Sequence, residues 1–240
     1  MFVKPLRPLC NMKHRVLISP ADSKLINELS MYNIEAIFTA PVDNLIEYER
    51  FHADIQLLRL KDSFFIYNCV ASKYSVLRGK KLFICEDPRP EYPFNVALNA
   101  AFLGDKLLCK ESSLNKKVRE FCEKNGTEII NVNQGYTKCS TLVLNERAVI
   151  TADRGIANTC DKNGVEALLI SEGNIKLSGD TYGFIGGASG VIGDTVYFFG
   201  NVELHPEFMI ISEFIKKQQM NYVSLSGEIL TDLGGFVLLN

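Results

Sequence analysis

The residue pair Lys138–Cys139 is the part of the sequence best suited to covalent chemistry. A thiolate is a strong nucleophile, and a neighbouring ammonium group favours the ionised form of a thiol. We therefore treat Cys139 as a candidate nucleophile and Lys138 as a candidate binding residue. The same cysteine opens the apolar run Cys139–Leu142, so a core thiol in a strand is the alternative interpretation.

Asp153 and Arg154 form a second polar pair, directly after the β-prone run 149–151. At the junction of a strand and a helix, such a pair either caps the helix or binds a carboxylate or phosphate at its first turn. His14 and His52 stand alone among apolar or basic neighbours, and ordinary hydrogen-bonded histidines are the expectation for both.

The seven cysteines show no metal-binding or disulfide pattern. Their number is odd and no two are closer than 13 residues, so no C-x-x-C pair exists. We expect no zinc or iron–sulfur site. Reduced thiols, most of them small core residues, are typical of a cytoplasmic protein.

Composition and charge exclude several classes of protein. The chain has 240 residues, of which 47% are hydrophobic, and its net charge of −2 gives no basic field for nucleic acid. No run of 18 apolar residues is present, so we expect no membrane span. Residues 1–13 are interrupted by prolines, and we interpret them as an N-terminal extension that is a poor signal peptide.

A supersecondary unit recurs along the rest of the chain. Turn dipeptides between two apolar runs return every 41 to 48 residues. We expect a β-hairpin at each, then a helix and a third strand, which makes a ββαβ unit. The turns are Lys61-Asp62, Gly104-Asp105, Asn145-Glu146 and Gly193-Asp194, and the expected first strands include 55–58, 96–98, 141–144 and 184–187.

Two of the expected helices can be described in more detail. Ser112 or Ser113 is the expected cap of a helix that carries Val118, Phe121 and Cys122 on its inner face and ends at Asn125-Gly126. Pro206 marks the start of another helix, with Phe208, Ile211 and Ile215, and also Ile210 and Phe214, in its candidate inner face.

The two ends of the chain supply a fifth unit in two pieces. The run 14–18 resembles the second strand of a hairpin without a first one, and 234–239 resembles a first strand with nothing after it. If these strands pair, five units close into a ring without an open edge. We therefore expect an α/β fold of five pseudo-symmetric ββαβ units in a single domain, 14–240. A two-domain protein divided near Pro88–Pro93 is the alternative.

This arrangement resembles the pentein fold, the five-bladed α/β propeller of guanidine-modifying enzymes such as the arginine and agmatine deiminases. The runs 134–140 and 183–189 resemble signatures of an uncharacterised bacterial branch. The family also includes translation initiation factor six, a non-catalytic pentein. In the enzymes, a cysteine near the C-terminus follows a Gly-Gly pair, but here no cysteine follows Gly235. The family's catalytic histidine has one counterpart, His205.

The resemblance implies a polar pocket on the axis of the ring, where the inner ends of the first strands converge. Carboxylates suit a guanidinium because they accept its planar fork of N–H groups. For Asp54 and Asp232, solvated positions at strand ends are the alternative. Catalytic candidates are Cys139, His205 and Asp232. Binding candidates are Asp54, Asn95, Lys138, Asp153, Arg154 and Ser189.

Two functions remain open. The first is hydrolysis of a C–N bond in a guanidine-type small molecule at a non-standard site, which needs no cofactor and no metal. The second is a pentein that has kept the pocket as a binding or interaction protein and lost the chemistry. In either case the expected partner is a small molecule, with self-association into a homodimer left open.

Overall fold

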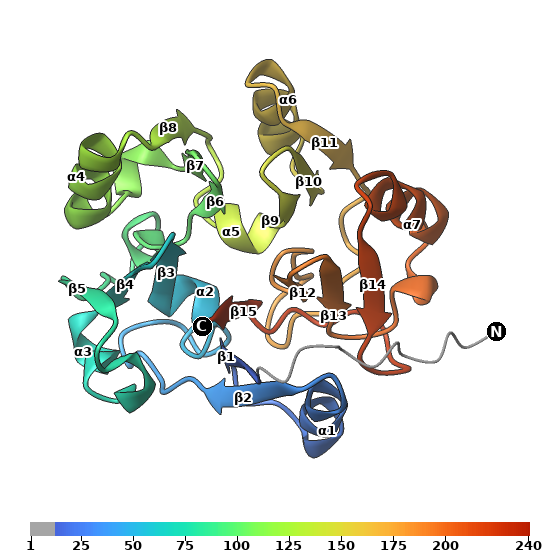
Figure 1. Ribbon diagram of the computed structural model, residues 1–240, viewed down its shortest axis with the longest axis horizontal. Helices are drawn as coiled ribbons and strands as arrows, with labels where there is room; N and C mark the ends of the chain where they lie inside the picture. The colour runs from blue at the N-terminus through green and yellow to red at the C-terminus, as the bar shows by residue number, and fades with distance from the viewer. Residues whose placement is uncertain (1–12) are drawn as a thin grey trace.

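Five small sheets surround a common axis in the computed structural model, which describes residues 13–240 (Figure 1). Each sheet has three strands, and the longer helices lie on the outside of the ring (Figure 1). The expected N-terminal extension, apart from Lys13, lies outside the described residues. Between Lys13 and Asn240, no helix is long and apolar enough to cross a bilayer.

All five units share one order of elements. The second strand of each unit pairs antiparallel with the first and parallel with the third. The first unit contains β15 (Phe236–Leu238), β1 (His14–Ile18), α1 (Ser23–Met31) and β2 (Ile34–Phe38), and the second β3 (Leu57–Leu60), β4 (Ser63–Tyr67), α3 (Asn68–Ala71), η1 (Ser75–Leu77) and β5 (Lys81–Cys85). The third contains β6 (Ala101–Leu103), β7 (Lys106–Cys109), η3 (Glu111–Ser113), α4 (Lys116–Asn125) and β8 (Glu128–Asn131). The fourth contains β9 (Thr141–Asn145), β10 (Ala148–Thr151), α6 (Arg154–Lys162) and β11 (Glu166–Leu169), and the fifth β12 (Ser189–Ile192), β13 (Thr195–Phe198), η4 (Val202–Leu204), α7 (Phe208–Lys217) and β14 (Asn221–Ser224).

The two ends of the described chain close the ring, as predicted. β15 pairs antiparallel with β1, with Leu17 opposite Val237 and Ile18 opposite Phe236. The first strand of each unit, which we call the leading strand, faces the axis (Figure 1). β15 contacts β3, β6 contacts β9, and β12 contacts both β9 and β15. The predicted α/β ring of five ββαβ units is therefore confirmed.

The hairpin turns and helix caps match the sequence with local corrections. Three of the four turns occupy the expected dipeptides. The turn expected at Asn145-Glu146 lies one residue later, at Glu146-Arg147. Asn115, not Ser112 or Ser113, caps α4, because the two serines belong to the preceding 3-10 turn, η3. Ile210 is 42% exposed, so it is not part of the inner face of α7.

The largest buried cluster joins several units. It includes Leu17 from the first unit, Phe65 from the second, Leu107 from the third and Cys139 from the turn before the fourth. Buried side chains on both sides of the Pro88–Pro93 segment therefore pack together. Burial of this apolar surface is the main stabilising contribution to the ring.

A short turn precedes every leading strand. The strands expected at 96–98 and 184–187 are wrong, because these residues lie before β6 and β12, and the strands expected at 55–58 and 234–239 begin inside such a turn. We call these five segments the axial turns. They are the one-turn helices α2 (Ala53–Gln56) and α5 (Thr137–Ser140), the turn that follows η2 (Phe94–Val96), the turn at 185–188, and Gly234-Gly235. Strands were expected at these places because a short, fully buried turn and a buried strand have the same apolar composition.

The axial turns lie so close together that one of them requires glycine. A Cβ atom on Gly186 would lie 2.3 Å from the carbonyl oxygen of Lys138 and 2.4 Å from that of Thr141. Because both neighbours are backbone atoms in a packed interior, neither can move away cheaply.

We expect Gly186→Ala to lower the free energy of unfolding by at least about 2 kcal/mol through overpacking. Urea denaturation of the two proteins would measure the change. Gly227→Ala is the matched control, because a Cβ atom there would meet nothing within 4 Å, and its free energy of unfolding should stay near the wild-type value. Equal stability of the two variants would contradict the close approach.

Candidate functional site

Asn99 links three of the axial turns through its side chain. Its Nδ2 group donates to the carbonyl oxygen of Asp54 at 3.1 Å. Its Oδ1 atom accepts from the backbone N–H of Lys138 at 2.8 Å and from that of Cys139 at 3.3 Å. The amide is 2% exposed, so these bonds form away from water. Asn99 therefore fixes the second, third and fourth units relative to one another at the axis.

Backbone hydrogen bonds complete this connection around the axis. The N–H of Gly187 donates to the carbonyl of Cys139 at 2.9 Å, and the N–H of Gly235 donates to the carbonyl of Gly187 at 2.7 Å. The N–H of Asp54 then donates to the carbonyl of Gly234 at 3.1 Å. Together with Asn99, these bonds form an unbroken ring through all five units, which we call the axial ring.

Cys139 and Asp54 meet inside the axial ring. The Sγ atom of Cys139 lies 3.2 Å from Oδ1 of Asp54 and 3.1 Å from Nδ2 of Asn99. Both residues are almost fully buried, with 2% of Cys139 and 3% of Asp54 exposed. The Oδ2 atom of Asp54 has no hydrogen-bond partner among the described residues. Together with His52, these residues form what we call the Cys139 cluster.

Charge and burial place the shared proton on the thiol. Burial, together with the nearby Asp54 and Asp232 carboxylates, raises the pKa of Cys139 well above its ordinary value. The expectation that Lys138 would lower this pKa is therefore wrong, because burial and two carboxylates outweigh the ammonium group. Burial also raises the pKa of Asp54 to about 6, although Lys138 and His52 oppose that shift.

His52 completes the cluster. One ligand atom each from His52, Asp54 and Cys139 lies within 4.8 Å of the other two, and all three residues are buried. The His52 imidazole is close enough to the Asp54 carboxyl to oppose the rise in its pKa. The three clustered residues are those of the described chain that could hold a metal ion.

Asp232 lies at the axis but already has partners for both oxygens. Its Oδ1 atom accepts from the N–H of Gly234 at 2.8 Å, and its Oδ2 atom accepts from the N–H of Phe184 at 2.9 Å. The residue is 3% exposed, so it is not the solvated strand-end residue of the alternative. Through these two hydrogen bonds the Asp232 carboxylate holds together the loops before β12 and β15.

Two other axial candidates also contact the backbone. The Nζ atom of Lys138 lies 3.3 Å from the carbonyl oxygen of Gly186, and the hydroxyl of Ser189 donates to the carbonyl of Ile185 at 2.6 Å. Lys138 keeps an electrostatic influence on Asp54. Ser189 is 1% exposed and starts β12, where its bond closes the turn at 185–188.

Asn95 belongs to a second buried group next to the cluster. Its Nδ2 atom contacts Oε2 of Glu49 at 3.0 Å and the hydroxyl of Tyr136 at 2.7 Å. The Tyr136 hydroxyl donates to Oε1 of Glu49 at 2.5 Å, and burial, together with this contact, raises the pKa of Tyr136. Tyr136 interacts electrostatically with Cys139, so the group lies beside the Cys139 cluster.

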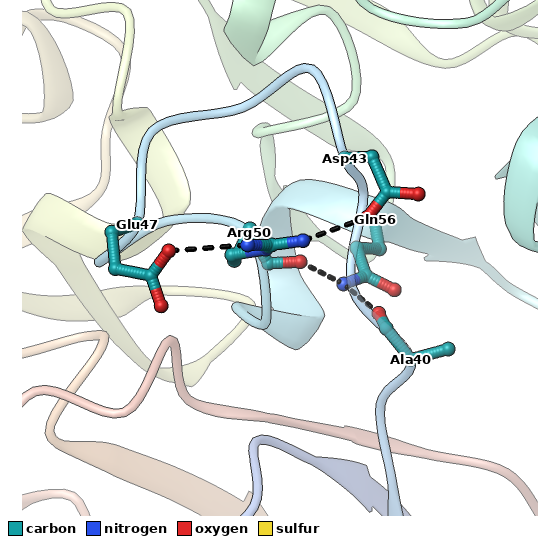
Figure 2. A network of polar contacts seen from close by, with 5 residues as sticks. All are labelled: Ala40, Asp43, Glu47, Arg50 and Gln56. Carbon is teal, nitrogen blue, oxygen red and sulfur yellow. Dashed lines mark hydrogen bonds and ion pairs between the residues drawn. The ribbon is translucent and has the colours of Figure 1, made fainter.

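The loop that carries Glu49 and His52 is fixed to the axial turn α2 (Figure 2). Gln56 in α2 donates from Nε2 to the carbonyl oxygens of Ala40 at 2.8 Å and Arg50 at 2.7 Å. The guanidinium of Arg50 contacts Asp43 at 2.7 Å and Glu47 at 3.1 Å (Figure 2). Because Gln56 is fully buried, these bonds hold both ends of the loop next to the axis.

Asp153 and Arg154 stand at the start of α6, away from the Cys139 cluster. Asp153 is the N-cap, and its Oδ1 atom accepts from the N–H of Ile156 at 2.9 Å, which supports the capping interpretation. No ion pair joins the two side chains among the described residues. Asp153 also lines a cavity of about 120 Å³, together with Gln134, Glu172 and Phe184.

His205 also lies apart from the Cys139 cluster. It follows η4 and precedes α7, which lies on the outside of the ring (Figure 1). Its Nδ1 atom accepts from the N–H of Glu207 at 3.1 Å, and burial lowers the pKa of the imidazole. His205 is therefore a buried residue at the junction of η4 and α7, and the structure does not bring this counterpart of the family's histidine to Cys139.

The sequence analysis missed three residues that the structure brings to the axis or beside it. Asn99 and Glu49 were not among the candidates, and His52 was assigned an ordinary role. None of them belongs to a recognisable motif, because each works together with residues from other units. One signal was present: Asp54, Asn99 and Cys139 precede their leading strands by two or three residues.

Comparisons with known proteins concern the whole ring. A family model described as Family of unknown function (DUF6873) matches residues 17–237. The fold is similar to that of DDAH from Pseudomonas aeruginosa in complex with citrulline, with a TM-score of 0.55 and 12% identity over 94% of this chain and 96% of that one. It is also similar to C. jejuni agmatine deiminase with substrate bound, with a TM-score of 0.51 and 14% identity over 92% and 81%. No curated protein matches the sequence. The predicted pentein fold is confirmed.

Proposed function

The chain belongs to the family of unknown function DUF6873, and from this premise and its pentein fold we propose that it hydrolyses a C–N bond of a guanidine-type small molecule. Cys139 is the nucleophile in this proposal. It reaches the axis from the fourth unit, whereas the resemblance to the enzymes places a cysteine after Gly235. Asp54 and Asn99 are its hydrogen-bonding partners.

The unpartnered Oδ2 atom of Asp54 is the observation that carries the proposal. A buried carboxylate oxygen is normally hydrogen-bonded, so an empty acceptor at the axis calls for a donor that arrives with a ligand. A guanidinium offers several N–H donors in one plane and a positive charge. Its carbon would then lie beside the Sγ atom of Cys139, because that atom is 3.2 Å from the other oxygen of the same carboxylate.

The first half of the reaction forms a covalent intermediate. Asp54 takes the thiol proton, and the thiolate sulfur bonds to the guanidinium carbon while the π electrons move to nitrogen. Asp54 then returns its proton to one nitrogen, which leaves as ammonia or an amine. The C–N bond is broken and an S-linked thiouronium cation remains on Cys139.

Water completes the reaction. Asp54 accepts a proton from a water molecule as the water oxygen bonds to the thiouronium carbon. The C–S bond then breaks while the proton of the new hydroxyl group passes to sulfur, and the proton held by Asp54 passes to the released ammonia or amine. The products are a ureido compound and the free thiol. One water is consumed for each ammonium or alkylammonium ion released, so neither an oxidant nor a cofactor is needed. The amide N–H of Asn99 stabilises the sulfur when it carries negative charge.

Tyr136 interacts electrostatically with Cys139, so we expect a substrate to reach the thiol past the group formed by Glu49, Asn95 and Tyr136. Tyr92 stacks on Tyr136 with ring centroids 5.8 Å apart, which adds an aromatic cover to this buried group. Only 2% of Cys139 is exposed, so catalysis requires these side chains to move. A closed site also excludes water from the carboxylate and the thiol before substrate binds.

A second function, ligand binding without turnover, is favoured by the protonation state of Cys139. Because burial and two carboxylates raise the pKa of this thiol, the nucleophilic form needs a proton transfer to Asp54. A pentein that only binds a cation would use the same unpartnered carboxylate oxygen and would leave the thiol protonated. Turnover and binding can be measured separately.

The experiment combines a turnover assay with thermal shift on the full chain. Arginine, agmatine and N-methylated arginines are incubated with the protein, and the ureido product and the released amine or ammonia are quantified. The proposal expects equal amounts of both products from at least one compound. A rise in melting temperature without product would establish the binding function instead. Neither product nor a shift across the panel would overturn both.

The mechanism also bears on where and how the protein works. We propose that it acts in the cytoplasm, because the reaction needs a reduced thiol and all six described cysteines are free. We also propose that residues 14–240 work as one domain, since the axial ring that holds the site draws on every unit.

A further inference from the structure

We propose that His52, Asp54 and Cys139 form a binding site for a divalent metal ion, with Zn²⁺ as the ion that fits it best. Imidazole nitrogen, carboxylate oxygen and thiolate sulfur are the three ligand types that zinc uses in proteins. Here one atom of each type lies within 4.8 Å of the other two, at the buried axis of the ring. The proposal goes beyond the hydrolysis proposed above.

The spacing of the three atoms is close to that of a tetrahedral site. Ligand bonds of about 2.0–2.3 Å place two ligands of one zinc ion about 3.6 Å apart. Oδ1 of Asp54 and Sγ of Cys139 are already 3.2 Å apart. His52 is the N-cap of α2, two residues before Asp54, and its ligand nitrogen lies within 4.8 Å of the other two ligand atoms, which is close to the separation that zinc requires.

Free bonding capacity at the cluster points to a ligand. The Oδ2 atom of Asp54 is buried without a partner among residues 13–240, and a nitrogen of His52 lies within 4.8 Å of the ligand atoms of Asp54 and Cys139. Buried polar groups are normally satisfied, and an unsatisfied carboxylate oxygen beside an imidazole and a thiol is the arrangement that a zinc ion would complete. A metal ion would also neutralise the negative charge of Asp54 and Cys139.

The donor set distinguishes zinc from other ions. Mg²⁺ and Ca²⁺ prefer oxygen ligands, so a site with one thiolate and one imidazole disfavours both. Asp232 is not part of the group of ligand atoms within 4.8 Å of one another, so it does not supply a fourth protein ligand in this arrangement. The fourth position is therefore left to water. The amide of Asn99, 3.1 Å from Sγ, supports the thiolate from outside the coordination sphere.

The proposed metal site and the proposed hydrolysis use the same side chains, so metal and substrate exclude one another. Metal binding is therefore measured on protein without any guanidine compound. Turnover by metal-free protein that fails to bind zinc would leave the hydrolysis intact and overturn the metal site. Tight zinc binding without any guanidine turnover by the metal-free protein would support the metal site and overturn the hydrolysis.

The test is a titration of chelator-treated full-length protein with Zn²⁺, followed by metal analysis after gel filtration. The expected result is one zinc per chain and a rise in melting temperature. Cys139→Ser and Asp54→Asn should each weaken binding at least about 100-fold. Cys69→Ser is the matched control, because Cys69 is exposed and lies outside the cluster, and its affinity should equal that of the wild type.

Co²⁺ gives a second readout that identifies the sulfur ligand. A thiolate-to-cobalt charge-transfer band should appear in wild type and in Cys69→Ser and should be absent from Cys139→Ser. Circular dichroism confirms that each variant is folded; if Cys139→Ser is not, the zinc affinity of Asp54→Asn and the cobalt spectrum of the wild type decide. No bound zinc, unchanged affinity in folded Cys139→Ser, or loss of binding in Cys69→Ser would overturn the proposal.

Discussion

Replacing Asn99 with alanine is expected to lower the free energy of unfolding by about 3–5 kcal/mol, more than most single substitutions in a protein of this size. The side chain supplies partners to three backbone groups at the axis: the carbonyl of Asp54 and the N–H groups of Lys138 and Cys139. Each group left unsatisfied in the interior costs about 1–3 kcal/mol. Because three axial turns depend on this one amide, the loss is expected to affect the whole ring.

Urea denaturation followed by circular dichroism would measure the effect. Asn174→Ala is the control, because Asn174 makes its hydrogen bonds at the exposed surface and should cost less than about 0.5 kcal/mol. Asn99→Asp separates the two functions of the amide: it keeps the acceptor for Lys138 and Cys139 but loses the donor and adds a charge beside Asp54. A loss below about 1 kcal/mol in Asn99→Ala would show that the axial ring does not hold the units together.

The fold was predictable because each unit has a recognisable local sequence pattern. Turn residues such as Gly104 and Gly193 adopt positive φ angles between two short apolar strands, and this pattern repeats with a nearly constant period. The closure of the ring followed from counting the expected strands. The first unit lacks its leading strand at the N-terminal end of the chain, and one unpaired strand remains at the C-terminal end. Neither inference needs any knowledge of contacts between units.

The axial turns were not predictable in the same way. The runs around Ile55 and Ile185 are as apolar as strands of that length, and local sequence does not distinguish a buried turn from a buried strand. The difference arises from closure, because five strands that converge on one axis must each be preceded by a change of direction. Cys139 is therefore in the one-turn helix α5 instead of a strand.

The candidate site was predictable in part. Asp54 and Cys139 were candidates by position, but their contact depends on two axial turns from different units. Superposing the repeats would have added Asn99, because it precedes its leading strand by two residues, as do Cys139, Gly187 and Gly234, with Asp54 at three. These five residues all take part in the axial ring.

That equivalence explains how a nucleophile can be displaced without losing its surroundings. In a ring with pseudo-symmetry, every axial turn presents its residues to the same small volume. The backbone N–H of Gly235 donates to Gly187, and that of Gly187 donates to Cys139. Two backbone hydrogen bonds therefore connect the Gly234-Gly235 turn, which no cysteine follows, with the turn that carries Cys139. A thiol on the fourth unit therefore faces the same axis as a thiol after Gly235 would.

If Cys139 is the nucleophile, Cys139→Ser should reduce guanidine turnover at least about 1,000-fold while leaving the protein folded. A serine hydroxyl keeps the hydrogen bonds to Asp54 and Asn99 but is a far weaker nucleophile at the pKa of an alcohol. Cys160→Ser is the matched control, because Cys160 is equally buried and packs in α6, away from the axis.

Turnover is measured as release of ammonia or amine, with mass spectrometry of the quenched wild-type reaction to detect the thiouronium adduct on Cys139. The adduct should be absent from Cys139→Ser and present in Cys160→Ser. Equal turnover in all three proteins would assign the chemistry to another group. Labelling by iodoacetamide gives an independent criterion: substrate should protect Cys139 in the native protein, and a thiol that reacts only after denaturation would contradict its role as a nucleophile that opens to solvent during catalysis.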